Sequence, residues 1–168
     1  LCRGLSEGFS SIAPMRPADQ SRLRFNWVAP LALSPHDPKT LYAGAQVVFR
    51  SRDRGDHWQE ISPDLTSNDT NKITFGGSIQ FCTITTLAES PAKAGIIWVG
   101  TDDGKVQLTK DGGTNWIDAT KAIALAGGPE DAWVTRVSAS PTAPGTAYVA
   151  KSRHRQDDFR PFAFQTTD

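Results

Sequence analysis

The sequence predicts an all-β fold: a partial β-propeller of four-stranded antiparallel blades, about three in number, with the last one incomplete. The motif [ST]-x-D-x-G-x-x-W occurs at 51–58 and again at 109–116, with its aspartates 58 residues apart. Ser-Pro pairs followed by short apolar segments recur upstream, at Ser34, Ser90 and Ser140. Within each unit, apolar residues alternate with a period of two, which is typical of strands. A repeat of this length with four strands per unit is typical of propeller blades.

Four strands are expected in each unit, ordered from the inside of the ring outward. The inner strands are Trp27–Leu33, Ile84–Ser90 and Trp133–Ser140. The second strands are 40–44, 96–101 and 146–151, and the third strands are 47–52, 105–110 and 162–167. The outer strands are His57–Ile61 and Asn115–Ala119. The short Ala-rich segment 119–126 is the candidate helix.

These strands divide the chain into successive units. The units are an N-terminal extension or loop (1–24), a first blade (25–62), a long loop (63–81), a second blade (82–120), a long loop (121–132) and a third blade (133–168) truncated in its motif. A propeller closes with roughly four to eight blades. We therefore expect either that the chain is a fragment of a longer protein, with the missing blades in the rest of it, or that copies of the chain associate to complete a ring.

The repeated motif has a structural rationale. An aspartate in a tight turn accepts backbone N–H bonds, the glycine adopts a positive φ, and the tryptophan covers the turn. We expect this structural role, rather than catalysis, for Asp53, Gly55, Trp58, Asp111, Gly113, Trp116 and Asp168, the last of which opens a third copy.

At these residues the sequence resembles the Asp-box, or BNR-repeat, β-propellers. Segments such as "LYAGAQVVFRSRDRGDHWQEISPDLT" and "GIIWVGTDDGKVQLTKDGGTNW" are similar to the sortilin-like propellers of large bacterial exported proteins, which are often labelled glycosyl hydrolases. The resemblance covers about residues 24 to 168. It implies an extracytoplasmic location, and it is specific for the fold rather than for an activity.

Composition excludes several classes of function. The 18 Lys and Arg residues balance 18 Asp and Glu residues, so a nucleic-acid partner is not expected. No apolar run reaches the roughly 20 residues that span a membrane. No metal-ligand or cofactor motif is present, so neither is expected. Cys2 and Cys82 permit at most one disulfide, and a buried free thiol is the simpler interpretation of Cys82.

Strand alternation places the long connections on one face of the propeller. The insertions 63–81, 121–132 and 152–160 are expected there, opposite the short aspartate turns, which suggests a binding face. The densest charged segment supplies the ligand-binding candidates. These are Arg153, His154, Arg155, Asp157, Asp158 and Arg160, whose arginines could hold a carboxylate or an acidic sugar. The alternative is a solvated loop with internal Asp–Arg pairs.

Three functions are compatible with this pattern. The first is a non-catalytic propeller segment that binds a protein, peptide or glycan, with aromatic platforms or core residues at Trp27, Phe75, Phe81 and Trp133. The second is part of a sialidase-like glycoside hydrolase, whose catalytic residues would lie mostly outside this segment. No motif selects an acid pair among Asp64, Glu130, Asp131 and Asp157, and the repeated tyrosines Tyr42 and Tyr148 indicate blade packing. The third is a purely structural role in the ring.

Overall fold

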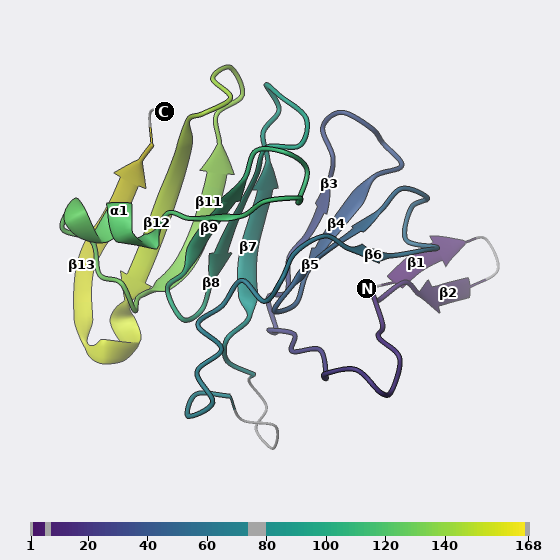
Figure 1. Ribbon diagram of the computed structural model, residues 1–168, viewed down its shortest axis with the longest axis horizontal. Coiled ribbons are helices and arrows are strands. Elements are labelled where there is room, and N and C mark those ends of the chain that lie inside the picture. Colours follow the sequence, from purple (N-terminus) through teal and green to yellow (C-terminus); the bar gives the residue numbers. More distant parts are fainter. Residues whose placement is uncertain (1, 6–7, 74–79, 167–168) are drawn as a thin grey trace.

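The computed structural model describes residues 2–5, 8–73 and 80–166, and its sheets are arranged as a fan of blades (Figure 1). Blade 1 has the strand order β3-β4-β5-β6, blade 2 has β7-β8-β9-β10, and blade 3 has β11-β12-β13. A separate hairpin, β1-β2, lies beside blade 1. All pairs are antiparallel. The fold is thus a partial β-propeller, as predicted.

Most strands of the three blades lie close to where they were expected, whereas the β1–β2 hairpin was not expected. Blade 1 contains β3 (Leu31–Leu33), β4 (Leu41–Gly44), β5 (Val48–Ser51) and β6 (Gln59–Glu60). Blade 2 contains β7 (Ile84–Glu89), β8 (Ile97–Thr101), β9 (Val106–Thr109) and β10 (Ile117–Asp118). Blade 3 contains β11 (Trp133–Ala139), β12 (Ala147–Arg153) and β13 (Asp158–Gln165), with the 3-10 turn η1 (His154–Gln156) between the last two. The candidate helix is α1 (Thr120–Leu125), and the hairpin is β1 (Cys2–Leu5) with β2 (Gly8–Ser11).

Two expected boundaries are wrong. The first inner strand does not begin at Trp27, because a turn precedes it: Ala29 N–H donates to the carbonyl of Asn26 at 3.1 Å. Pro30 then lacks a backbone donor, and the strand begins at Leu31. Residues 152–160 are not a long loop, because β12 and β13 extend through most of them. They form a projecting hairpin (Figure 1).

The blades pack through apolar faces. One buried cluster joins blade 1 to blade 2 and includes Tyr42, Val48, Ile84 and Val99. A second cluster joins blade 2 to blade 3 around Trp98. Glycine on the second strand permits the close approach, since a Cβ at Gly100 would lie 2.3 Å from Val134 Cγ1. Inner strands therefore press directly on the second strand of the preceding blade.

The two aspartate turns, 51–58 and 109–116, have matching hydrogen bonds. Asp53 Oδ1 accepts the N–H of His57, and Asp111 Oδ1 accepts that of Asn115, both at 2.9 Å. These bonds to backbone N–H groups hold the pKa of Asp53 well below its usual range and lower the pKa of Asp111 to about 2. Asp168 lies outside the described residues.

The motif tryptophans contact the preceding element rather than their own turn alone. Trp116 Nε1 donates to the carbonyl of Ile61 in blade 1 at 3.1 Å. Trp58 Nε1 donates in the same way to Ile12, at 2.8 Å, just after β2. The N-terminal segment is therefore packed on blade 1, and Arg16 adds a two-pronged ion pair with Glu60 on β6.

Candidate functional site

The longest connections lie on the side of the fan opposite the aspartate turns, along the lower edge of Figure 1. We call this side the loop face; its described part comprises residues 62–73, 80–83, 102–105, 126–132 and 153–157. Several of its segments touch one another. The backbone N–H of Ser67, in the first connection, donates to Asp103 Oδ2 in blade 2 at 2.7 Å. Arg153 Nη2 of blade 3 lies 3.8 Å from Asp131 Oδ2, which belongs to the connection between blades 2 and 3.

The tip of the β12–β13 hairpin forms a cluster with the start of β11, which we call the Trp133 cluster: Asp131, Trp133, Arg153 and Arg155. The guanidinium of Arg155 lies over the Trp133 ring, 4.4 Å from its centroid, in a cation–π contact. Arg153 Nε is buried and has no hydrogen-bond partner among the described residues. The cluster thus consists of a half-buried indole with the exposed Arg155 over its ring, and of a half-buried Arg153 beside Asp131.

Lys151 holds in place the connection that precedes this cluster. Its side chain is buried, and Nζ donates to the carbonyls of Pro129 at 2.5 Å and Glu130 at 3.3 Å. Burial lowers the pKa of Lys151 to about 8. The ammonium therefore fastens the connection that carries Asp131 to strand β12.

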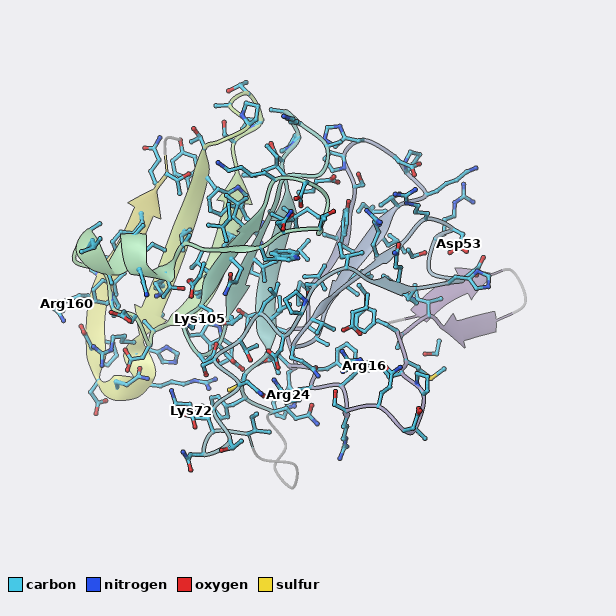
Figure 2. The ribbon with its side chains drawn as sticks, in the orientation of Figure 1. Arg16, Arg24, Asp53, Lys72, Lys105 and Arg160 are labelled. Carbon is cyan, nitrogen blue, oxygen red and sulfur yellow. The ribbon has the colours of Figure 1, made fainter. Side chains whose placement is uncertain are left out.

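The remaining predicted residues of the hairpin are separate from the Trp133 cluster. Arg160 forms a two-pronged pair with Asp158, from Nε at 2.9 Å and Nη2 at 2.7 Å, and lies on the outer side of β13 (Figure 2). This pairing lowers the pKa of Asp158 to about 2. His154 is exposed and its Nδ1 lies 3.1 Å from Ser152 Oγ. Asp157 has a φ of 56° at the turn and is exposed. The Asp158–Arg160 pair is of the kind that we expected if this segment is a solvated loop rather than a binding site.

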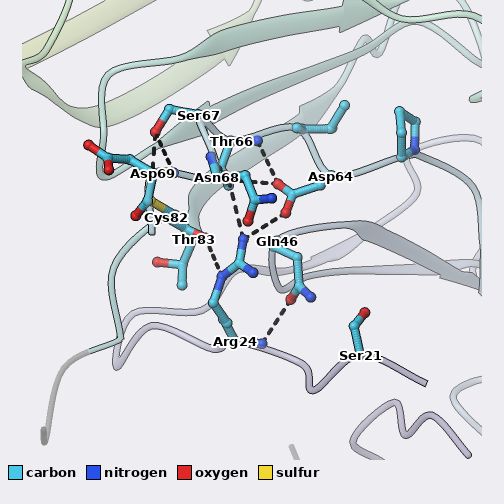
Figure 3. A network of polar contacts seen from close by, with 12 residues as sticks. Ser21, Arg24, Gln46, Asp64, Thr66, Ser67, Asn68, Asp69, Cys82 and Thr83 are labelled. Atoms are coloured by element: carbon cyan, nitrogen blue, oxygen red, sulfur yellow. Dashed lines mark hydrogen bonds and ion pairs between the residues drawn. The ribbon is translucent and has the colours of Figure 1, made fainter. Parts of the chain in front are cut away.

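A second polar network, shown in Figure 3, holds the first connection against the segment before blade 1. Arg24 Nη2 donates to Asp64 Oδ2 at 2.7 Å, and Arg24 Nε donates to the carbonyl of Cys82 at 3.1 Å. The backbone N–H of Arg24 donates to Gln46 Oε1 at 2.8 Å. Cys82 is a free, buried thiol whose pKa is raised by burial. The guanidinium of Arg24 therefore has a structural role, since it joins the first connection to the segment before blade 1.

Asp102 and Asp103 lie in the turn after β8, where the sequence indicates a tight Asp-Gly hairpin. Asp102 is 5% exposed and accepts hydrogen bonds from Thr83 Oγ1 at 2.6 Å and Asn26 Nδ2 at 3.1 Å. Burial raises the pKa of Asp102. Sequence reasoning missed this junction of blades 1 and 2, because Asn26 and Asp102 are 76 residues apart.

The carboxylates of the loop face do not assemble an evident acid pair. Asp64 is bonded to Arg24, and Asp102 is buried beneath Asn26 and Thr83. Glu130 and Asp131 are exposed. Within the described ranges, no group of three or more His, Cys, Asp or Glu side chains could hold a metal ion. Nor is any described helix long and apolar enough to cross a membrane.

The aromatic candidates have different surroundings. Trp27 is 73% exposed in this chain. Trp133 and Phe81 are half-buried, and Phe75 lies outside the described residues. Tyr42 is buried and donates to Glu89 Oε1 at 3.1 Å across the blade 1–blade 2 junction. Tyr148, at the same strand position in blade 3, is 51% exposed.

Comparisons with known proteins agree with the fold. No family model matches the sequence, and no curated protein matches it. A GH74 xyloglucanase from Xanthomonas campestris is similar in structure, with a TM-score of 0.51 and 25% identity over 72% of this chain. A GH74 enzyme from Niastella koreensis has a TM-score of 0.53 at 19% identity over 87%, and an ancestral GH74 enzyme has 0.54 at 14% over 80%.

These neighbours are β-propeller proteins much longer than this chain. The match covers 14% of the ancestral enzyme, 18% of the Xanthomonas enzyme and 21% of the Niastella enzyme. The similarity therefore places the chain among propeller segments. The narrower Asp-box and sortilin-like resemblance stays a prediction.

Proposed function

We propose that the loop face binds a glycan carrying carboxylate groups, without hydrolysing it, as part of a larger propeller outside the cytoplasm. The Trp133 cluster carries the proposal: two arginines, one of them held over the indole of Trp133, meet at the tip of a projecting hairpin. Guanidinium groups bind carboxylates through paired hydrogen bonds, and the ring contact orients the guanidinium of Arg155.

The arginines differ in how far they are already occupied. Arg160 is saturated by Asp158 on two atoms, whereas Arg153 is 3.8 Å from Asp131 and Arg155 stacks on an indole. An incoming carboxylate can therefore reach the donors of Arg153 and Arg155 without breaking a two-pronged ion pair. The GH74 neighbours, including a xyloglucanase, support a glycan over a peptide.

Part of a glycoside hydrolase is the second candidate, favoured by the same neighbours. Hydrolysis requires two carboxyl groups, roughly 5–9.5 Å apart, on either side of the scissile bond. On the described loop face Glu130 and Asp131 are exposed, but they adjoin one another in sequence. For this candidate we expect the catalytic residues to lie mostly outside this segment.

Calorimetric titration with polygalacturonate, and with neutral xyloglucan for comparison, tests the proposal. We expect Arg155→Ala to weaken polygalacturonate binding by about tenfold, equivalent to about 1.4 kcal/mol. Arg160→Ala is the matched control, since it removes the same charge from the same hairpin but from an occupied pair. Its effect should stay within about twofold.

The outcomes separate the two candidates. Saturable binding without new reducing ends supports recognition without catalysis, whereas release of reducing ends supports the hydrolase. If both arginine variants bind as the wild type does, the ligand does not lie at the Trp133 cluster. Stronger binding of xyloglucan than of polygalacturonate would contradict the role given to the arginines.

A further inference from the structure

A cavity with a volume of about 450 Å³ opens between blade 1 and blade 2 on the aspartate-turn side, and we call it the junction cavity. Its walls are the connections between the inner and second strands of both blades, the ends of β4, β5 and β7, and the second aspartate turn. Both blades have all four strands, so the walls belong to two complete sheets. Small-molecule sites have volumes of roughly 300–1,000 Å³, so the junction cavity is large enough for one.

The polar lining of the junction cavity is not repeated at the next junction. Backbone bonds of this side recur in every blade, and the strand registers identify the equivalent side chains. Between blades 2 and 3 the equivalents of Tyr42, Arg50 and Glu89 are Trp98, Leu108 and Ala139. Trp98 and Leu108 are buried in the cluster that joins those two blades. Packing of one blade on the next therefore does not require polar side chains at these positions.

The three acids that line the junction cavity already have partners within the chain. Asp37 and Asp111 each accept hydrogen bonds from backbone and side-chain groups of their own turns. Glu89 accepts three hydrogen bonds, from Ser34 Oγ, the hydroxyl of Tyr42 and the backbone N–H of Gly95. Donor groups of a ligand would therefore compete with bonds that the chain itself makes.

The arginines of the junction cavity are less fully bonded. The guanidinium of Arg52 is exposed, and it forms no hydrogen bond or ion pair with any residue that the structure describes. Arg50 is half-buried; its Nη1 lies 3.4 Å from the carbonyl of Gly112, a long contact, and its Nη2 lies 3.2 Å from Gln59 Oε1. Burial raises the pKa of Tyr42, and the charges of both arginines oppose that rise, so both lie near its hydroxyl. The bonding capacity that remains on the described wall is therefore mainly that of positively charged donors.

We propose that the junction cavity binds a small molecule through a single carboxylate group, held by the guanidinium groups of Arg52 and Arg50. A guanidinium presents paired N–H donors that match the two oxygens of a carboxylate. The three acids on the wall favour a singly charged group, because a phosphate monoester brings a charge of about −1.5 to −2 close to them. This site is separate from the Trp133 cluster, which lies on the opposite face.

Titration of the 15N-labelled protein, followed by NMR, tests the proposal. The probes are glucuronate, glucose, which is the same sugar without the carboxylate, and inorganic phosphate. We expect glucuronate to cause saturable shifts of the amide signals of Gly95 and Gly112, which line the cavity, and glucose to cause none. Arg52→Gln should weaken glucuronate binding by about tenfold, since it removes a charged hydrogen-bond donor. Arg52→Lys, which keeps the charge but not the paired donors, should have a smaller effect.

Arg54→Gln is the matched control. Arg54 is exposed two residues further along the chain and does not line the cavity, so this change removes the same charge from the same turn. Binding to this variant should stay within about twofold of the wild type, and circular dichroism establishes that each variant is folded. Four results would overturn the proposal: glucuronate shifts confined to signals of the Trp133 cluster or absent, glucose binding as well as glucuronate, tighter binding of phosphate, or equal effects of Arg52→Gln and Arg54→Gln.

Discussion

Replacement of Gly113 by alanine tests how closely adjacent blades approach one another at the aspartate turns. Gly113 has a φ of 103°, and an added Cβ would lie 2.5 Å from the carbonyl oxygen of Ile61 in blade 1. A non-glycine residue with left-handed backbone costs about 1–2 kcal/mol. Overpacking against a backbone atom, which cannot rotate away, adds about 1–3 kcal/mol. We therefore expect a total loss of about 2–5 kcal/mol in the free energy of unfolding.

Gly112 is the matched control. It also has a positive φ, 73°, but a Cβ there would meet a flexible side chain, Arg50 Nη1, at 3.7 Å. Gly112→Ala should therefore cost only the conformational part, about 1–2 kcal/mol. Gly55→Ala should fall between the two, since its Cβ would lie 3.0 Å from Ile12 Cδ1 and 3.1 Å from Ile12 Cβ, closer than the contact at Gly112 but farther than the 2.5 Å at Gly113.

Urea unfolding followed by tryptophan fluorescence measures these differences. For a denaturant slope of about 1–3 kcal/mol per molar, the steric part moves the Gly113→Ala midpoint about 1 M below that of Gly112→Ala. Equal midpoints for the two variants would refute the reasoning, because they would show that blade 1 moves away from the added Cβ without any loss of stability. An unchanged slope is needed for the comparison to be one of stability.

Two further changes test the buried polar groups. Glu89→Ala leaves the hydroxyl of Tyr42 and two other donors without their acceptor. We therefore expect the free energy of unfolding to fall by about 1–3 kcal/mol, against about 0.5–1.5 kcal/mol for Tyr42→Phe. Equal losses of the two variants in urea unfolding would contradict this. Lys151 has a pKa lowered to about 8, so between pH 8 and about 10.5 the unfolded chain binds more protons and the wild type gains stability as pH rises. Lys151→Met should lack that gain in stability when its urea midpoints at pH 8 and pH 10 are compared. If the midpoints of the wild type and of Lys151→Met change in parallel with pH, Lys151 is not the source of the gain.

Most of the fold could be predicted because its determinants are local and repeated. Alternation of apolar residues locates strands, and the spacing of Asp53 and Asp111 sets the repeat. The first inner strand was expected to begin too early, because the turn at Asn26 and the missing donor of Pro30 outweigh the apolar pattern at Trp27. The packing of the N-terminal segment on blade 1 was missed because Ile12 and Trp58 are 46 residues apart in the sequence.

The candidate site was predictable only in outline. Placing all long connections on one face brought Arg153 and Arg155 to the same side as Asp131 and Trp133, where the structure pairs them. Which arginine is free could not be foreseen, since the pairing of Asp158 with Arg160 depends on side-chain geometry at a strand start. The burial of Asp102 depends on a segment 76 residues away.

The two faces of the fan differ in how far they repeat, and this difference indicates which of them is scaffold. On the aspartate-turn side, the connection between the inner and second strands of every blade is closed by the same backbone hydrogen bond. A serine N–H donates to a carbonyl six residues later, at 2.8–2.9 Å: Ser34 to Thr40, Ser90 to Ile96 and Ser140 to Thr146. On the loop face each blade has its own arrangement, from the buried turn at Asp102 to the Trp133 cluster. A ring can use the same structural bond in every blade, but a ligand needs each recognition group once. Because the loop face breaks the repeat while these backbone bonds obey it, substitutions in the repeated turns should act through stability and those at the Trp133 cluster through binding.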